Sequence, residues 1–279
     1  MTIRQHLAAA AALATIALNL VFWCVPLAVL VVVRGIAPPA RARTQAAGEA
    51  IYRIAVGFDD WWLRRVSGAA WHCPDPAPAR DAPCIVISNH RSWADIFLIQ
   101  SAIARHGPIV KFLCKRELVW IPILGLIFLA FDFPVVRRRG SRRLPESERR
   151  AADRRRVREA CETLRTRPAA MLTFVEGTRF TPEKHARSAG PYRTLLPPRA
   201  GGFEAIAESL EGDAAVVLDM TLHYPRSPAF WAFLGGTAGD IEVRTEAFPL
   251  RAVLDAGPRH WLEARWRAKD AGLAGPVID

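Results

Sequence analysis

A nearly all-apolar segment near the start of the chain, Leu7 to Val33, limits the folds that this sequence can adopt. Its 27 residues exceed the ~20 that a helix needs to cross the hydrocarbon core of a bilayer. The segment is too long for the core of a signal peptide, and no small-residue cleavage site follows it. We therefore expect 7–33 to be a transmembrane helix. The alternative is a helix that lies in one leaflet of the membrane.

Charges on the two sides of this segment predict its orientation. Arg4 precedes it, whereas Arg34, Arg41 and Arg43 follow it. Positively charged flanks tend to stay in the cytosol. The excess of positive charge after the segment therefore predicts that the bulk of the chain faces the cytoplasm.

The remaining N-terminal residues predict a second helix and then a linker. Pro38-Pro39 should end the first helix, and 45–67 has an amphipathic helical pattern with tryptophans of the kind found at lipid interfaces. We expect residues 1–67 to form membrane-anchoring helices, residues 68–83 a linker rich in proline and aspartate, and residues 84–279 one folded domain.

Beyond residue 83, patterns typical of strands alternate with patterns typical of helices, which predicts an α/β domain. The predicted strands are 84–88, 109–114, 133–136, 170–175, 214–222 and 240–247. The predicted helices are 92–105, 146–166, 201–210 and 258–271. The uncharged stretch 118–131 is too short to span a bilayer; it is either core or an apolar surface for acyl chains or the membrane.

The charge balance implies an anionic partner. The net charge is +11, and eleven arginines against three acidic residues lie between Arg137 and Arg158. A phospholipid surface, a phosphorylated substrate or a nucleic acid would each suit such a charge. Aromatic residues do not interleave with the arginines, so stacking on bases is not indicated. The five cysteines are widely spaced and support neither a disulfide framework nor a zinc site.

A histidine and an aspartate follow the first predicted strand of the domain. Ligands of open α/β sheets bind at the carboxyl ends of strands, and His90 lies at such an end, five residues before Asp95. A positioned imidazole can act as a general base, and a carboxylate can orient it. The alternative is structural, because Ser92 and Asp95 have the spacing of a capping box at a helix start.

A second polar loop follows the predicted strand 170–175. Its residues are Glu176, Gly177, Thr178 and Arg179. Glycine permits a tight turn there, and the planar guanidinium of arginine suits phosphate oxygens. A surface turn with a salt bridge is the alternative interpretation.

Four blocks in this order and spacing resemble the glycerolipid acyltransferase family, of the lysophosphatidic acid (1-acylglycerol-3-phosphate) acyltransferase type. The blocks are Asn89–Asp95, Lys111–Leu118, Phe174–Thr181 and Leu196–Gly202. The resemblance implies a single domain with a mixed sheet flanked by helices. The later segment 216–221 lacks the proline that many members carry, a version similar to lysophospholipid and lysocardiolipin acyltransferases and a bacterial inner-membrane branch.

The resemblance also implies roles for individual residues. His90 would deprotonate the acceptor hydroxyl for direct attack on an acyl thioester, with Asp95 orienting it and no covalent intermediate, metal or cofactor. Arg179 would hold the acceptor phosphate. Residues that would help it or shape the pocket are Lys115, Arg116, Glu176, Gly177 and Thr178.

The partners implied are an acyl-CoA or acyl carrier protein donor, lysophosphatidic acid as acceptor, and an anionic phospholipid membrane. The expected location is a bacterial inner membrane, with the domain on the cytoplasmic side. Reacylation of another lysophospholipid, of the lysocardiolipin or lysophosphatidylglycerol type, is the alternative within this class. A membrane-tethered nucleic-acid-binding protein is the alternative outside it, and it leaves His90 and Asp95 without a role.

Overall fold

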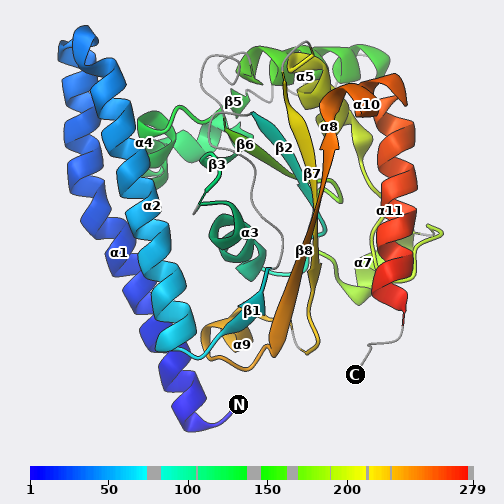
Figure 1. The fold of residues 1–279 in the computed structure, drawn as a ribbon, viewed down its shortest axis with the longest axis horizontal. Helices are drawn as coiled ribbons and strands as arrows, with labels where there is room; N and C mark the ends of the chain where they lie inside the picture. The colour runs from blue at the N-terminus through cyan, green and yellow to red at the C-terminus, as the bar shows by residue number, and fades with distance from the viewer. Residues whose placement is uncertain are drawn as a thin grey trace.

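The computed structural model describes residues 1–73, 83–104, 106–136, 146–161, 169–188, 190–211, 214–226 and 228–275. A long hairpin of two helices lies along one side of an α/β domain (Figure 1). The expected α/β class and mixed sheet are confirmed.

The main sheet of the described residues has the strand order β1-β8-β7-β2-β6-β3. Neighbouring strands are parallel except for β7 and β8, which pair antiparallel. A separate two-stranded sheet joins β4 and β5. The strands are β1 Ala70–His72, β2 Cys84–Ser88, β3 Val110–Phe112, β4 Cys114–Lys115, β5 Val135–Val136, β6 Ala170–Phe174, β7 Val216–His223 and β8 Asp240–Pro249.

Strand β2 shows why the sequence forms a sheet covered on both faces. All five of its residues are buried, as expected of a central parallel strand without a solvent-facing side. Cys84 and Val86 contribute to the hydrophobic cluster on one face, and Ile85 and Ile87 to the cluster on the other. The continuous apolar run at 84–88 therefore marks the centre of the sheet.

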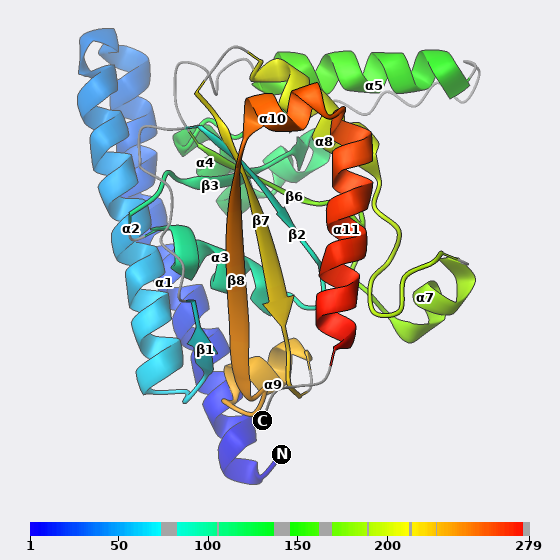
Figure 2. The same cartoon turned by 45° about the vertical axis from the view of Figure 1, so that its right-hand side comes forward.

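Helices cover the two faces of the sheet unequally. Helix α3 and, behind it, α1 and α2 lie on one face, whereas α8, α10 and α11 lie on the other (Figures 1 and 2). The helices are α1 Ile3–Ile36, α2 Arg41–Arg65, α3 Ala94–Ala104, α4 Pro122–Ala130, α5 Glu146–Cys161, α7 Pro182–Ser188, α8 Ala200–Ser209, α9 Phe230–Leu234, α10 Leu250–Asp255 and α11 Pro258–Ala274, with 3-10 turns η1 Pro38–Ala40 and η2 Arg116–Trp120.

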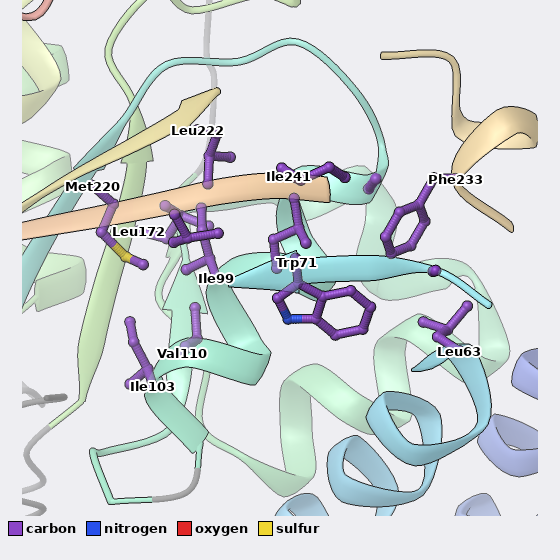
Figure 3. Packing of buried hydrophobic residues seen from close by; sticks show 14 of the residues in the cluster. Leu63, Trp71, Ile99, Ile103, Val110, Leu172, Met220, Leu222, Phe233 and Ile241 are labelled. Carbon is purple, nitrogen blue, oxygen red and sulfur yellow. The ribbon is translucent and has the colours of Figure 1, made fainter. Parts of the chain in front are cut away.

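The N-terminal hairpin is part of the packed molecule. Ala9 and Leu63 belong to the same buried cluster as Ile99, Leu172 and other residues of the domain, and Figure 3 shows Leu63 beside Trp71 and Phe233. Helix α1 is long and apolar enough to cross a membrane, and within the described residues it is the one helix that passes this test. Its large apolar side chains are mostly exposed.

Both ends of α1 are tied to the domain. Near its start, the indole Nε1 of Trp231 donates to Nδ1 of His6 at 2.9 Å. At its end, Arg34 pairs with Asp132 at 3.0 Å and donates to the carbonyls of Leu129 and Ala130 at the end of α4. Helix α1 therefore contacts the domain near both of its ends, whereas Asn19 in its middle bonds to α2.

Some boundaries differ from those expected. The predicted linker 68–83 contains β1, which pairs with β8, so the sheet begins before residue 84. The predicted strand 109–114 is divided into β3 and β4, which belong to different sheets. The last five residues of the predicted helix 146–166 and the arginines at 137–143 lie outside the described residues.

The apolar stretch 118–131 forms the turn η2 and helix α4, and it is largely a surface. Trp120, Ile121 and Leu129 are exposed, Trp120 by 78%. Gly125 permits the close approach of η2, because a Cβ there would lie 2.0 Å from the carbonyl oxygen of Val119. Of the two interpretations of this stretch, the structure favours the apolar surface.

Candidate active site

The predicted site residues lie in loops at one edge of the main sheet. Strands β2, β6 and β7 run parallel, with Ser88 opposite both Phe174 and Met220. The loops that leave β2 and β6 are therefore neighbours at the carboxyl edge. Helix α5, which carries much of the predicted arginine run, lies at the other end of the sheet (Figure 1).

His90 and Asp95 form a pair. Nδ1 of His90 lies 2.8 Å from Oδ2 of Asp95, which assigns the proton on Nδ1 as the donor to the carboxylate and leaves Nε2 to accept a proton. The imidazole ring stacks on Phe174 with 3.9 Å between ring centroids and 12° between planes. Two contacts, one polar and one aromatic, thus fix the ring.

Asp95 also caps the start of α3. It therefore contacts His90, as the catalytic interpretation predicts, and closes a helix start, as the structural interpretation predicts. Its Oδ2 accepts the backbone N–H groups of Arg91 at 2.7 Å and Ser92 at 2.9 Å. The side chain is fully buried at the first turn of α3. Its capping bonds hold the loop in the conformation that brings His90 to the carboxylate.

Asn89 anchors the same loop to β7. Its amide donates to the carbonyl of Leu222 and its carbonyl accepts the N–H of Leu222, both at 2.9 Å. Asn89 is fully buried. The side chain thus continues the pairing of β2 with β7 after the strand has ended.

The loop after β6 turns tightly at Gly177. Its φ of 70° is a conformation that glycine adopts without strain, and its N–H donates to Phe174 at 2.8 Å. Thr178 accepts a hydrogen bond from Nζ of Lys184 at 2.7 Å, and Lys184 also donates to the carbonyl of Arg179 at 2.9 Å. Lys184, which the sequence did not single out, adds a second cation here.

The exposed guanidinium of Arg179 lies 4.8 Å from the ring centre of Trp93. Trp93 belongs to the loop between His90 and Asp95 and is 53% exposed. The two polar loops therefore meet, as predicted, with a cation at their junction.

Glu176 points inward from the same loop. It is 2% exposed, accepts the N–H of Leu196 at 3.4 Å, and its Oε2 has no hydrogen-bond partner within the described part of the chain. Burial raises the pKa of Glu176 to about 7, against the opposing effect of the Leu196 and His90 N–H groups and of Arg91 and Lys269. Glu176 thus joins the loop after β6 to Leu196.

A third segment, residues 193–196, lies beside these loops; of its residues, the sequence had singled out Leu196 alone, as the start of the fourth block. Nη2 of Arg91 donates to the carbonyl of Thr194 at 2.6 Å, and its guanidinium covers the ring of Phe180. Asp270 of α11 accepts the N–H groups of Arg193, Thr194 and Leu195 at 2.7 to 3.0 Å. Helix α11 thus fixes this segment from behind.

Lys115 and Arg116 stay predictions. Arg116 is exposed at the start of η2, after the chain has left the main sheet, and the side chain of Lys115 lies outside the described residues. Within the described part of the chain, no three His, Cys, Asp or Glu side chains are grouped so that they could hold a metal ion.

The His90–Asp95 pair thus lies at the carboxyl edge of a mixed sheet. Residues 71–222, more than half of the chain, match the family model described as Acyltransferase. The chain therefore belongs to the acyltransferase family.

Relatives carry more specific names. The chain is 29% identical over 203 residues to the 1-acyl-sn-glycerol-3-phosphate acyltransferase gamma of Mus musculus, and 28% identical to the delta enzyme of Bos taurus. Each alignment covers 67% of this chain and 51% of the relative, so the chain spans about half the length of these proteins.

A solved structure has the same fold. The 1-acyl-sn-glycerophosphate (LPA) acyltransferase PlsC from Thermotoga maritima superposes with a TM-score of 0.61, covering 99% of this chain and 98% of that chain. At 16% identity, this likeness shows the architecture, including the N-terminal helices, and not the substrate.

Proposed function

We propose that this protein transfers a fatty acyl group from an acyl thioester to the free hydroxyl of lysophosphatidic acid, giving phosphatidic acid. The observation that carries the proposal is the His90–Asp95 pair, whose 2.8 Å contact leaves Nε2 of His90 as a base. The names of the relatives supply the acceptor.

In the proposed reaction, Nε2 of His90 takes the proton of the acceptor hydroxyl as its oxygen attacks the thioester carbon. The C–O bond forms, the C–S bond breaks, and the thiolate leaves with the proton from His90. Asp95 stabilises the imidazolium between these steps. The acyl group passes directly between the substrates, with no acyl-enzyme.

We propose that Arg179 binds the phosphate of the acceptor, with Thr178 and Gly177 shaping the loop. Its guanidinium is exposed beside the loop of His90, and stacking on Trp93 limits its orientations. Arginine can bind phosphate through two parallel hydrogen bonds. Lys115 and Arg116 remain candidates for additional phosphate contacts.

We further propose that the α1–α2 hairpin docks the domain on a membrane from the cytoplasmic side. The exposed apolar side chains of α1 and of the 118–131 stretch form one candidate surface: Leu7, Leu18, Phe22, Val25, Val29, Val32, Trp120, Ile121 and Leu129. Because both ends of α1 contact the domain, a helix lying in one leaflet suits these contacts better than an isolated spanning helix.

The test is acyl transfer by purified protein, with acyl-CoA or acyl carrier protein as donor. The acceptors are lysophosphatidic acid, lysophosphatidylglycerol and an uncharged monoacylglycerol. We expect lysophosphatidic acid to be used best, and Arg179→Ala to raise its KM by about tenfold or more while the donor KM stays unchanged. Arg251→Ala, which removes an exposed arginine of α10, is the control. Equal use of all three acceptors would refute the phosphate assignment.

A further inference from the structure

Asp95 has a partner on its second oxygen. Oδ2 accepts Nδ1–H of His90 and the N–H groups of Arg91 and Ser92. Oδ1 faces the other way and accepts a hydrogen bond from the hydroxyl of Tyr224. The carboxylate is therefore held on both oxygens, and the Tyr224 bond is the one that comes from a distant part of the chain.

Tyr224 reaches Asp95 because the end of β7, just before Tyr224, is bonded to the loop that carries Asp95. The strand ends at His223, and Leu222 is joined by two hydrogen bonds to the side chain of Asn89. Tyr224 follows Leu222 by two residues, and Asp95 follows Asn89 by six, so both side chains lie close to this junction. The register of β7 against β2 thus decides where the Tyr224 hydroxyl lies.

The Tyr224 hydroxyl keeps its proton. Burial, and then the charge of Asp95 and its hydrogen bond, raise the pKa of Tyr224 well above its usual value, against the opposing effect of Ser92 and Arg91. A neutral phenol can donate to Oδ1 throughout the range in which an imidazole titrates. Ser92, its other side-chain partner, belongs to the same loop.

We propose that Tyr224 is a positioning residue for the reaction, acting on His90 through Asp95. The inference rests on the proposed function and adds β7 to the elements that set the base. By bonding Oδ1, the hydroxyl fixes the plane of the carboxylate so that Oδ2 meets Nδ1 of His90. It also withdraws negative charge from the carboxylate, which moderates the attraction of Asp95 for a protonated imidazole.

Tyr224→Phe tests this with little change in packing. Loss of one hydrogen bond to a charged group should lower kcat by about tenfold and leave both KM values unchanged. With Oδ1 bare, Asp95 holds the imidazolium more strongly, so the acidic limb of the kcat/KM profile should move to higher pH. Arg91 and Glu176 also face this pair, but both are retained in the wild type and the variant, so they cancel from the comparison.

The chain provides matched controls, because it has three tyrosines. Tyr52 is buried and accepts a hydrogen bond from the N–H of Val110, and Tyr192 is buried in the same hydrophobic cluster as Leu262 and Trp266 of α11. Tyr52→Phe and Tyr192→Phe should leave kcat and the pH profile unchanged. An unchanged profile in Tyr224→Phe, or the same change in all three variants, would overturn the proposal. An inactive wild type would instead refute the proposed function.

A second measurement tests the bond between Tyr224 and Asp95 without substituting Tyr224. Incorporation of 3-fluorotyrosine gives three fluorine signals, of which Tyr52→Phe and Tyr192→Phe identify two and leave the third for Tyr224. Asp95→Asn should shift the Tyr224 signal and leave the others unmoved. No shift of that signal would overturn the proposed bond even if Tyr224→Phe did not fold.

Discussion

Two buried carboxylates at the site, Asp95 and Glu176, differ in the number of donors around them. Asp95 accepts four hydrogen bonds, from His90, Arg91, Ser92 and Tyr224. Glu176 has one unpartnered oxygen and a pKa raised by burial to about 7. The difference predicts that Glu176 makes the stability of the fold depend on pH.

The sign follows from the direction of the shift. The folded state keeps the proton of Glu176 up to about pH 7, its raised pKa, whereas the unfolded chain loses it near the ordinary glutamate pKa of 4.5. Between these values the folded state binds more protons, so the free energy of unfolding falls as pH rises. In wild type, this titration should lower the free energy of unfolding by up to about 3 kcal/mol between pH 5 and pH 8. Glu176→Gln has no such carboxyl and should not show this loss.

Urea unfolding at pH 5 and pH 8 measures this effect. Glu263→Gln, which changes a half-buried glutamate on α11, should show the same pH dependence as wild type. If the free energy of unfolding of Glu176→Gln changed with pH as it does in wild type, the pKa of Glu176 would not be raised in the folded state, and this prediction would be wrong.

Among individual residues, the sequence predicted the site residues that follow predicted strands in short polar loops. His90, Asp95, Glu176 and Arg179 follow strands, and their residue types indicate their chemistry. Tyr224 could not be predicted, because it lies 129 positions from Asp95. Local spacing carries no information on such a contact.

Among the elements, α11 has a particular influence on the site. Asp270 accepts three backbone N–H groups and the hydroxyl of Thr194. Burial alone would raise the pKa of Asp270, but these hydrogen bonds lower it overall. In the same segment, the carbonyl of Thr194 accepts a hydrogen bond from the guanidinium of Arg91. The last helix therefore fixes a segment that contacts the loop of His90.

Asp270→Asn should destabilise the fold by about 2–3 kcal/mol, because hydrogen bonds to a charge are replaced by weaker neutral ones. The midpoint of urea unfolding measures the change. Asp255→Asn provides the control: this carboxylate is exposed and 3.9 Å from Arg251, so less than about 0.5 kcal/mol is expected. Equal midpoints for the two variants would show that α11 does not stabilise the segment in this way.

Hydrophobic pattern located most of the long elements and missed several of the short ones. Strand β2 and helix α3 were predicted because each is a mostly apolar run, of five and eleven residues, bounded by polar residues. Strand β1 has three residues, and helices α7, α9 and α10 have five to seven, too few for a period to emerge. Their conformation depends on the neighbours on which they pack.

For the whole molecule, the main question is how the chain meets the membrane. Composition predicted that α1 is apolar and long, but only the packing shows that its two ends contact α9 and Asp132 of one domain. A 34-residue helix is about 50 Å long. If it crossed the bilayer, these two parts of the domain would face opposite sides.

We therefore expect both ends of α1 on the same side of the membrane. Single cysteines at Arg4 and Gly35, in a background without the native cysteines, should both react with a membrane-impermeant maleimide from the cytoplasmic face. Arg4 is exposed, and a side chain at Gly35 meets no atom within 4 Å. Labelling of the two positions from opposite faces would show that the helix spans, whereas retention after a carbonate wash is expected in either case.

The central claim is that His90 is the base of an acyl transfer to lysophosphatidic acid, and one comparison tests it most directly. Acyl transfer is measured for wild type, His90→Ala and His260→Ala, the last changing an exposed histidine of α11. We predict that His90→Ala lowers kcat by about 10²–10⁴-fold at an unchanged melting temperature, and that His260→Ala keeps full activity. A folded His90→Ala protein that retains wild-type kcat would contradict the account.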